Sequence, residues 1–373
     1  MSEERQEQGT PLQSRLLQIG IGIGGALVFP IIAILLSFVI GAVIVLITGN
    51  NPLAAYLALI EGAFGSAEDF GRTLVYTTPL IFTGLAVAVA FRAGLFNIGG
   101  EGQLYIGAIT AAWLGVSLGG LGLVAIPLAL AGCLVTGFMW GSIPGFLKAY
   151  FGAHEVITTI MLNFIGINLA YYLAQHPLRQ SGPIPGTESI PYGARLPLLG
   201  LSLGRANFGI LIALLAALVL YLLLWRTGLG FRIRAVGLSP GAAEYAGMGI
   251  GTNTVLALAI GGSFAALGGG VEVMGVYGNM DVPFVANLGF NGIGVALLGR
   301  NHPAGVVLGA LLFGGLTSGA QEMQFATDVP LQLASVLLAV ILLLVTATKL
   351  VEFIIGKRAR ALAGVHLEKG LGG

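Results

Sequence analysis

The sequence predicts an all-α, polytopic membrane protein with about ten transmembrane helices and both termini in the cytoplasm. Charged residues make up 9% of the 373 positions, against roughly 25% in soluble domains. Apolar residues make up 56%, and the mean hydropathy is +0.93. A soluble fold cannot cover so much apolar surface with so few polar side chains, so most of the chain must lie in a bilayer. The net charge of +1 gives no indication of nucleic-acid binding.

The first predicted span covers residues 16–47 and ends at Gly49-Asn50-Asn51-Pro52. Because about 20 apolar residues cross a bilayer, this helix is long or tilted. The polar, acidic residues 1–15 do not resemble a cleavable signal peptide, so we expect a cytoplasmic tail. The GIGIGG run within the span fits a dinucleotide fingerprint, but no strand precedes it. Close packing between helices is therefore the better interpretation of these glycines.

Residues 73–91 form the second predicted span, which ends at Arg92. Residues 102–147 carry no charge and are too long for one helix, so Gly119-Gly120 divides them into a third and a fourth span. Lys148 closes the fourth span, and residues 156–172 form the fifth.

A proline-rich segment, residues 175–207, follows the fifth span. Proline lacks the N–H that a helix interior needs, so the segment is predicted to be an extramembrane loop. Residues 208–225 form the sixth span. The prolines of the loop are Pro177, Pro183, Pro185, Pro191 and Pro197.

Residues 228–250 form a short polar loop between two charge-free spans. Ser239 can cap a helix whose first position is Pro240, and Gly247 or Gly249 can end that helix in a left-handed conformation. The small residues of this predicted two-turn helix permit close approach by another protein, although an ordinary interfacial helix fits equally well. The candidate contact residues are Ser239, Pro240, Gly241, Ala242, Ala243 and Glu244.

The four remaining predicted spans cover residues 253–276, 284–298, 304–320 and 331–348. The transmembrane domain therefore extends over residues 16–352. The basic residues 353–373 form the C-terminal tail.

Lysine and arginine residues decide the orientation, because they are enriched in cytoplasmic loops. Ten spans place both termini on the same side, and thirteen of the 17 basic residues share that side. The termini and residues 228–250 are therefore predicted to be cytoplasmic, and residues 175–207 external. The thirteen are Arg5, Arg15, Arg92, Lys148, Arg226, Arg232, Arg234, Arg300, Lys349, Lys357, Arg358, Arg360 and Lys369; the other four are Arg72, Arg179, Arg195 and Arg205.

Five polar residues near membrane depth are candidates for a substrate path. Polar groups inside a span are costly and often line a pathway. Two of them belong to FNIGGEGQLYIGA, residues 96–108, whose glycines disfavour a continuous helix. A broken helix at membrane depth is tolerated only where it is buried in protein or lines a cavity. The five candidates are Asn97, Glu101, Gln103, Asn163 and Glu272.

Three of these candidates also have a structural interpretation. Asn163 can hydrogen-bond to a neighbouring helix. Glu101 can stabilise a helix N-terminus at the cytoplasmic interface, near Arg92. Glu272 can lie at the outer interface, because it falls toward the end of its predicted helix.

Several absences narrow the function. The sequence contains no G-x-x-x-x-G-K-[ST] motif, so the chain itself is not expected to hydrolyse ATP by that route. The four histidines lack the spacing of a metal site. The single Cys133 excludes an internal disulfide. We therefore expect no catalytic residues, no metal and no cofactor, and we do not expect an enzyme.

Four motifs in order resemble one family: residues 96–108, HEVITTIMLNFI from His154, AVGLSPGAAEYAGM from Ala235 and FNGIGVALLGRNHPAG from Phe290. That family is the permease subunit of bacterial ABC importers of the branched-chain amino acid and monosaccharide type. The FNIGGEGQ form is similar to nucleoside importer permeases served by a basic-membrane-protein-type binding lipoprotein. The resemblance covers about residues 12–352. Ser239 departs from it, since many relatives have Asn there, but both residues cap helices.

The resemblance implies a multi-pass permease of the bacterial inner, or plasma, membrane. Its implied partners are an ATP-binding cassette ATPase subunit, a second related permease, an external substrate-binding lipoprotein and membrane lipid. It implies nucleosides as substrates and an ATPase-coupling role for residues 239–244. A simple sugar such as ribose is the alternative substrate, and an ATPase-independent secondary transporter or channel is the alternative class. Whether the two permeases form a homodimer or a heterodimer stays open.

Overall fold

The computed structural model describes residues 31–346. The predicted tails, residues 1–15 and 353–373, lie outside these residues, as do the start of the first predicted span and the end of the tenth. The described residues divide into a larger unit, residues 53–334, and a smaller unit formed by residues 31–52 and 335–346.

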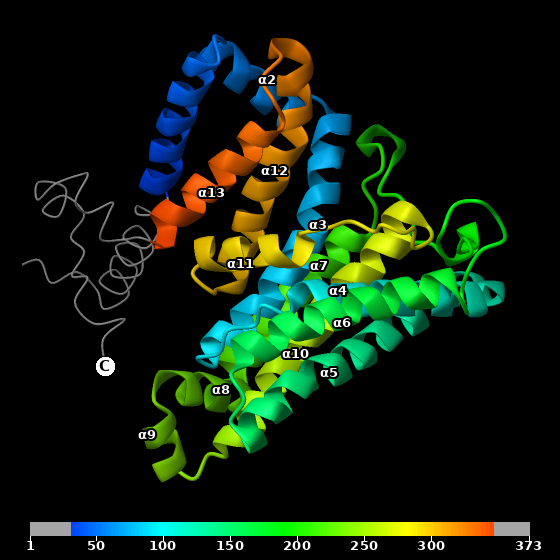
Figure 1. The fold of residues 1–373 in the computed structure, drawn as a ribbon, viewed down its shortest axis with the longest axis vertical. Coiled ribbons are helices and arrows are strands. Elements are labelled where there is room, and N and C mark those ends of the chain that lie inside the picture. The colour runs from blue at the N-terminus through cyan, green and yellow to red at the C-terminus, as the bar shows by residue number, and fades with distance from the viewer. Residues whose placement is uncertain (1–30, 347–373) are drawn as a thin grey trace, which may run out of the picture. The chain divides into compact units, whose positions relative to one another are not determined.

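The larger unit is built of α-helices, as predicted (Figure 1). Within the described residues, six helical stretches are long and apolar enough to cross a bilayer. They are α3 (Ala67–Arg92), α5 (Ala125–Phe151, after a 3-10 turn), α6 (Glu155–Gln175), α7 (Gly209–Arg226), α10 (Ile250–Glu272, followed by a π-turn, Val273–Tyr277) and α12 (Pro303–Thr327). The other helices are α2 (Pro52–Phe64), α4 (Gly100–Ser117), α8 (Gly228–Leu238), α9 (Pro240–Tyr245) and α11 (Leu288–Leu298).

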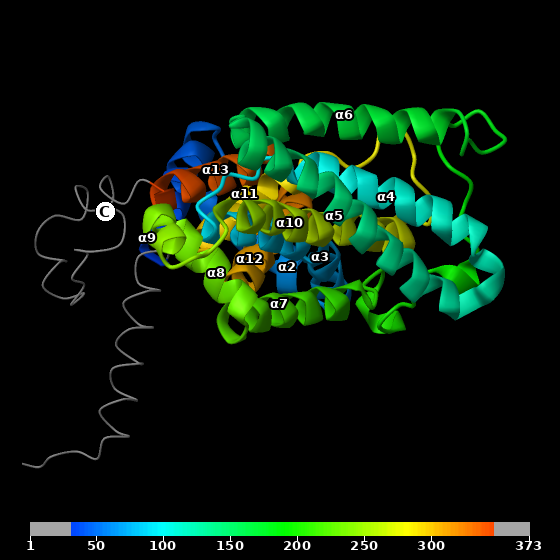
Figure 2. The ribbon, with the colours of Figure 1, turned by 90° about the horizontal axis from the view of Figure 1, so that it is seen from below.

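Helices α3 and α10 form the centre of this unit. About four-fifths of the apolar stretch of each is buried, whereas α5, α6 and α7 are buried over two-fifths of theirs or less. In Figure 2, α6 and α7 lie at opposite edges with α10 between them. In a membrane protein the exposed leucine-rich faces of such outer helices can face lipid, because lipid is as apolar as the side chains.

Glycine allows α10 to approach its neighbours closely. A Cβ on Gly107 of α4 would collide with the carbonyl oxygen of Ala266, and one on Gly262 would collide with the carbonyl oxygen of Gly137 in α5. Small residues at such crossings bring backbones into contact, which stabilises helix association in a bilayer. The glycine-rich composition thus has a direct packing role at the centre of the fold.

The proline-rich segment between α6 and α7 is non-helical apart from two 3-10 turns, Tyr192–Ala194 and Leu201–Leu203. Its free backbone amides pair with the end of α10 and the residues after it. Thr187 N donates to the Met280 carbonyl over 3.0 Å, and Ile190 N donates to the Gly278 carbonyl over 2.7 Å. The predicted loop is therefore an ordered covering over one end of α10.

Several elements differ from the predicted spans. Helix α2, which lies between the first and second predicted spans, was not predicted. Residues 284–298 contain only the 11-residue α11, about 16 Å long at 1.5 Å per residue, which is too short for a hydrocarbon core of about 30 Å. The polar loop 228–250 contains α8 in addition to the predicted helix. The number of spans stays a prediction, because several of the apolar helices are short.

The interruption predicted within residues 96–108 covers only the first part of that segment. The break lies in residues 93–99, and α4 continues without interruption from Gly100 through Gly102 and Gly107. Glycine is tolerated within α4 because it allows the close contacts that neighbouring helices make there.

In the smaller unit, a helix described from Ile31 to Ile47 packs against α13 (Gln332–Thr346). Apolar side chains form a core at this contact. They are Ala33, Leu344, Ile32, Leu36, Val340 and Val345.

Candidate functional site

Four of the five predicted path residues, Asn97, Glu101, Gln103 and Asn163, meet around the first turn of α4, in what we call the polar hub. All four side chains are buried. Asn97 lies in the connection between α3 and α4. Its amide donates to Gln103 Oε1 over 3.2 Å, and its Oδ1 accepts from the Gly99 N–H at 3.0 Å. These bonds fold the connection onto the start of α4.

Asn163 joins α6 to the same place. Its Oδ1 accepts from the Gly102 N–H at 2.8 Å, and its Nδ2 donates to the Ile98 carbonyl over 2.7 Å. A Cβ on Gly102 would lie 2.7 Å from the Asn163 Cα, so the glycine is what lets the two helices approach. Asn163 therefore makes the bond to a neighbouring helix that its structural interpretation predicted.

The Glu101 carboxylate caps the N-terminus of α11. Its two oxygens accept from the N–H groups of Asn287 and Gly289, at 2.7 and 2.6 Å. The first N–H groups of a helix lack partners within the helix, and the helix dipole favours an anion there. Glu101 itself is 2% exposed, and the N-terminus that it caps belongs to α11, not to its own helix α4.

Tyr105 lies one turn after Glu101 and therefore on the same face of α4. Its hydroxyl donates to the Phe284 carbonyl over 3.2 Å, and the Phe284 N–H donates to the Tyr171 hydroxyl over 3.1 Å. Phe284 lies in the non-helical segment 278–287 that connects the π-turn to α11. Glu101 and Tyr105 thus hold this segment at two points, and the sequence reasoning missed the role of Tyr105.

Aromatic rings line this segment. Tyr105 and Phe284 meet edge to face with centroids 5.6 Å apart, as do Tyr105 and Tyr171. Tyr277 packs on Phe284 at 5.5 Å. The available signal in the sequence was a tyrosine four residues after a membrane-depth acid, the spacing at which helical side chains share a face.

Glu272 lies apart from the polar hub, at the last residue of α10. Its side chain is 5% exposed, and no group among the described residues donates a hydrogen bond to it. A buried carboxylate without a partner is costly, so a site that keeps one is a candidate for function. The π-turn that follows, a feature frequent at functional sites, carries Tyr277, which lies close enough to interact with the Glu272 charge.

The predicted helix in the polar loop is confirmed as α9. The Ser239 hydroxyl accepts from the Ala242 N–H, Pro240 takes the first helical position, and Gly247 follows the helix with φ of 77°. Helix α8 precedes it and is capped by Thr227, whose hydroxyl accepts from the Gly230 N–H. Both starts follow from local side-chain chemistry.

The surface of α9 is exposed and partly apolar. Gly241 and Ala242 are exposed, and beside them Leu238 and Tyr245 are 82% and 98% exposed. Ala243 differs from the expectation that all three small residues face a partner, because it is 3% exposed and packs within its own chain. Exposed apolar side chains on a short helix indicate a surface for contact with another molecule.

Helix α8 rests directly on the connection between α3 and α4. A Cβ on Gly237 would collide with the Arg92 carbonyl oxygen, and one on Gly94 would come 3.1 Å from the Gly237 carbonyl oxygen. This backbone contact joins the exposed helices to the residues that lead into the polar hub. A displacement of α8 must therefore move this connection or break the contact.

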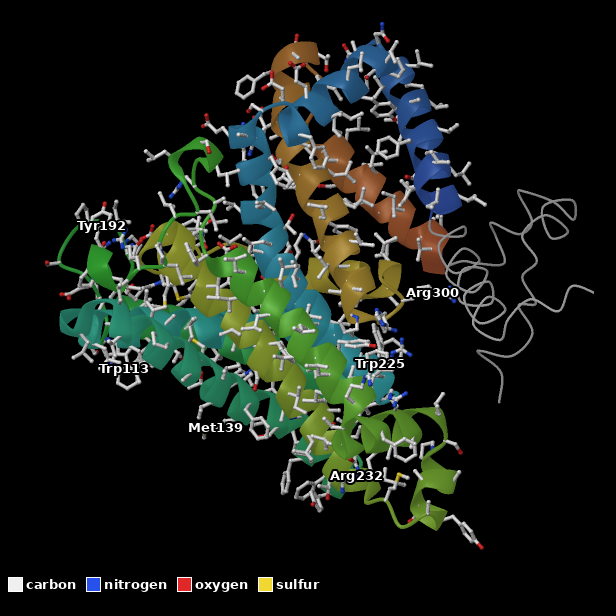
Figure 3. The ribbon with its side chains drawn as sticks, turned by 180° about the vertical axis from the view of Figure 1, so that it is seen from behind. Trp113, Met139, Tyr192, Trp225, Arg232 and Arg300 are labelled. Atoms are coloured by element: carbon white, nitrogen blue, oxygen red, sulfur yellow. The ribbon has the colours of Figure 1, made fainter. Side chains whose placement is uncertain are left out.

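The basic residues of the larger unit gather at the two ends of α10, in the two groups that the sequence predicted. Figure 3 shows Trp225 and Arg232 near one end and Tyr192 at the other. At the second end, Arg205 donates to the Val276 carbonyl and Arg195 to the Ile190 carbonyl. The group near the start of α10 contains Arg92, Lys148, Arg226, Arg232, Arg234 and Arg300; the other contains Arg72, Arg179, Arg195 and Arg205.

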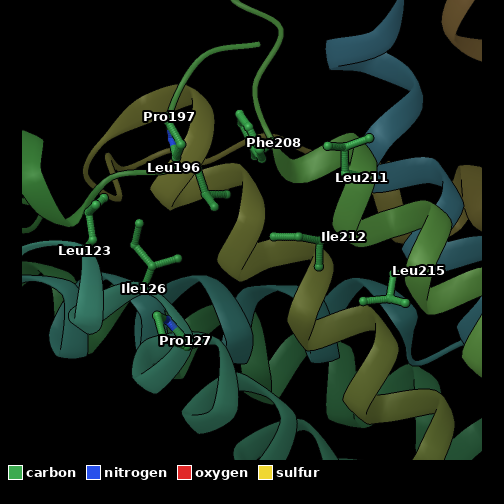
Figure 4. Close-up of a pocket in the computed structure, with 9 residues that line it drawn as sticks. All are labelled: Leu123, Ile126, Pro127, Leu196, Pro197, Phe208, Leu211, Ile212 and Leu215. Carbon is green, nitrogen blue, oxygen red and sulfur yellow. The ribbon is translucent and has the colours of Figure 1, made fainter.

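A surface cavity of about 350 Å³, lined by apolar side chains, lies between the start of α5, the proline-rich segment and α7 (Figure 4). Its lining offers no side-chain hydrogen bond, so it does not suit a polar solute. A smaller cavity of about 240 Å³ includes Trp113, Arg179 and Glu188. The larger cavity is lined by Leu123, Ile126, Pro127, Leu196, Pro197, Phe208, Leu211, Ile212 and Leu215.

Buried polar groups within apolar helices, a non-helical segment inside the bundle and exposed helices between spans are typical of membrane transport proteins. The chain belongs to the family described as branched-chain amino acid transport system / permease component, which matches residues 70–346. It is therefore a permease component of an ABC transporter, a transport subunit rather than an enzyme.

The curated relatives carry the likeness over nearly the whole chain. A guanosine ABC transporter permease of Bacillus subtilis is 40% identical over 89% of this chain and 96% of its own length. A nucleoside ABC transporter permease of Lactococcus lactis is 36% identical over 88% and 93%. A glucose ABC transporter permease of Haloferax volcanii is 34% identical over 85% and 87%. Bacillus subtilis and Lactococcus lactis each also have a second permease of the same description; these two proteins are 28% and 27% identical to this chain, respectively.

Proposed function

We propose that this chain translocates nucleosides as a subunit of an ATP-driven importer in the bacterial inner membrane. The observation that carries the proposal is the 40% identity to a guanosine permease over almost the full length of both chains. A second nucleoside permease follows at 36%. Membership of the ABC permease family leaves the ATPase-independent alternative without support.

The proposed complex contains this chain, a second related permease, an ATP-binding cassette ATPase and an external binding lipoprotein. A heterodimer of permeases is supported by the two relatives found in each of two bacteria. The ATPase is required because this chain has no phosphate-binding loop motif. The lipoprotein would dock on residues 175–207 and release the nucleoside between the two permeases.

In the proposed orientation, residues 228–250 and both tails face the cytoplasm. The support is the separation of basic residues between the two ends of α10, since the larger group belongs on the cytoplasmic side. Helix α9 would then dock on the ATPase through Gly241 and Ala242, with Ser239, Pro240 and Glu244 beside them. Ala243 would support this surface from within.

The proposed coupling route starts at α9 and continues through α8. Helix α8 contacts the α3–α4 connection at Gly237 and Gly94. That connection enters the polar hub, and Glu101 of the hub holds the start of α11. Movement of α9 after ATP binding would therefore reach the segment 278–287 through a continuous series of backbone and side-chain contacts.

We assign contact with the nucleoside to Glu272 and Tyr277. A carboxylate can accept hydrogen bonds from ribose hydroxyls, and an aromatic ring can stack on a base; such sites combine apolar walls with a few placed polar groups. Asn97, Glu101, Gln103 and Asn163 border the path in this proposal by holding its elements, because their polar atoms bond within the chain.

A simple sugar such as glucose or ribose is the second candidate substrate, supported by the 34% identity to a glucose permease. The test is uptake into proteoliposomes that contain the complex purified through a tag on this chain, with the binding lipoprotein added. We expect ATP-dependent uptake of labelled guanosine that excess unlabelled uridine or adenosine reduces and excess glucose does not. Uptake of glucose or ribose in place of nucleosides would overturn the substrate assignment.

A further inference from the structure

A cluster of basic and aromatic side chains lies where α7 ends, outside the polar hub. It consists of Arg92, Arg234, Trp225 and His302, and we call it the arginine–tryptophan cluster. The Arg92 and Arg234 guanidinium carbons lie 5.3 and 5.7 Å from the centroid of the Trp225 ring. The His302 ring packs on the same indole with centroids 4.9 Å apart. Figure 3 shows the nitrogen-rich side chains that gather around Trp225.

Backbone carbonyls hold both guanidinium groups without neutralising them. Arg92 Nε donates to the Asn301 carbonyl over 2.9 Å, and Arg234 Nε donates to the Leu224 carbonyl over 3.0 Å. Among the described residues, neither arginine forms an ion pair. Two cations fixed beside each other repel, so their position favours binding of an anion between them.

The pKa of His302 reports the same positive potential. Burial lowers the pKa of this imidazole from its ordinary value, and the charge of Arg92 lowers it further. His302 Nδ1 accepts a hydrogen bond from the Ala304 N–H, and a ring nitrogen that accepts a hydrogen bond carries no proton. The imidazole is therefore neutral and adds no positive charge to the cluster. The cluster therefore depends on its two arginines for anion attraction.

An exposed apolar stripe on α7 leads to this cluster. Four leucines on the stripe are about half exposed. Their spacing of four, three and four residues keeps them on one helical face, and Trp225 follows three residues after the last. Tryptophan is enriched where a membrane span reaches the lipid headgroups. The stripe consists of Leu211, Leu215, Leu218 and Leu222.

We propose that the arginine–tryptophan cluster binds the phosphate of an anionic phospholipid whose acyl chain lies along the α7 leucine stripe. The stripe is what selects a lipid over a free anion, because it gives an apolar chain a continuous contact that ends at the cations. Basic pockets between membrane helices bind such headgroups. The lipid would bridge α3 and α8 and would hold α8 on the α3–α4 connection.

The full-length chain in detergent can be titrated with phosphatidylglycerol and, separately, with phosphatidylcholine of the same acyl chains, and bound lipid counted by native mass spectrometry. We expect the wild-type chain to prefer phosphatidylglycerol. Arg234→Gln should weaken phosphatidylglycerol binding about fivefold, the effect of one basic residue near an anionic surface, and leave phosphatidylcholine binding unchanged. The matched control is Arg232→Gln, on the same helix but exposed and outside the cluster, which should stay within about twofold of wild type.

Equal losses in the two variants would overturn the proposal, because they would indicate general attraction to surface charge. Displacement of the lipid by inorganic phosphate would also overturn it, since the site would then bind a free anion. If Arg234→Gln does not elute as a folded protein, photoactivatable phosphatidylglycerol on the wild-type chain decides. Labelling of α7 or α8 near Trp225 supports the site, and labelling confined to other helices contradicts it.

Discussion

The polar hub and the α9 surface contain the same kinds of residue and use them in opposite ways. Both are rich in small residues, and each contains a glutamate and a helix N-terminus. In the hub, buried side chains bond to backbone groups of the same chain, as Asn163 does with Gly102 and Ile98. On α9, Gly241 and Ala242 are exposed, while the Ser239 cap and the buried Ala243 support the helix from below. The hub is complete within this chain, whereas α9 presents a surface that another molecule can complete.

The two acids at membrane depth show the same contrast. Glu101 accepts two backbone hydrogen bonds and caps α11. Glu272 is equally buried but accepts none from the described residues. A polar residue in a span therefore indicates a pathway only when its bonding capacity is not already used, and the sequence alone does not reveal which case holds.

The largest expected effect tests the α9 surface. Ala242→Arg should abolish nucleoside uptake and detach or uncouple the ATPase, while the permease still folds and inserts. An interface core tolerates neither overpacking nor an unpaired charge, and the loss in binding free energy can reach several kcal/mol. The measurements are uptake and the amount of ATPase that co-purifies with the variant, and Ala242→Ser is the matched small, polar control.

The result that would break this side of the comparison is near-normal uptake with a stoichiometric ATPase in the Ala242→Arg complex. Arginine is well tolerated at a cytoplasmic membrane surface, because its long side chain reaches water. Helix α9 would then be an ordinary interfacial helix.

The next effect tests the hub. Glu101→Ala should lower the free energy of unfolding by about 3 kcal/mol, because it leaves the buried N–H of Gly289 and the partly buried N–H of Asn287 without an acceptor. Glu101→Gln should cost less, since its one amide oxygen can still accept from Asn287 or Gly289. Thermal unfolding in detergent, followed by size-exclusion chromatography, measures both variants.

Uptake by Glu101→Ala should fall further than the amount of folded protein, because the variant also removes the contact through which the proposed coupling route reaches α11. The KM for nucleoside of the folded fraction should stay unchanged, and a raised KM at unchanged stability would instead place Glu101 on the substrate path.

Local chemistry explains which parts of this fold could be predicted. The α9 start follows from Ser239 and Pro240, which are neighbours in sequence, and the long spans follow from runs of apolar residues. The bond between Glu101 and Asn287 joins residues 186 positions apart, so no local pattern contains it. Helices α2 and α11 were missed or misjudged because a short apolar run does not distinguish a crossing helix from a buried one.

The candidate site, like the fold, could be predicted from the sequence only in part. The sequence identified all four residues of the hub, because polar groups are rare in apolar spans. It did not separate their role from that of Glu272, because bonding depends on how distant helices pack. The contact between Gly237 and Gly94 had no signal beyond the glycines themselves, and glycine is common throughout this chain.

The smallest expected change in stability tests Glu272, the buried acid that accepts no hydrogen bond from the described residues. Glu272→Gln keeps the size of the side chain and removes the charge, and no hydrogen bond from the described residues is lost with it. Burying an unpaired carboxylate is costly, so we expect the variant to unfold at the same temperature as wild type or higher. Uptake should weaken, because a hydrogen bond to a charged group contributes about 1.5–3 kcal/mol; the KM for nucleoside should therefore rise about tenfold or more. The same substitution at Glu101 is the control, since it should lower stability with no change in the KM of the folded fraction. A Glu272→Gln protein that unfolds at a lower temperature than wild type and transports with a normal KM would show that both acids are structural. The contrast between Glu101, which accepts hydrogen bonds within the chain, and Glu272, which is proposed to accept them from the substrate, would then no longer hold.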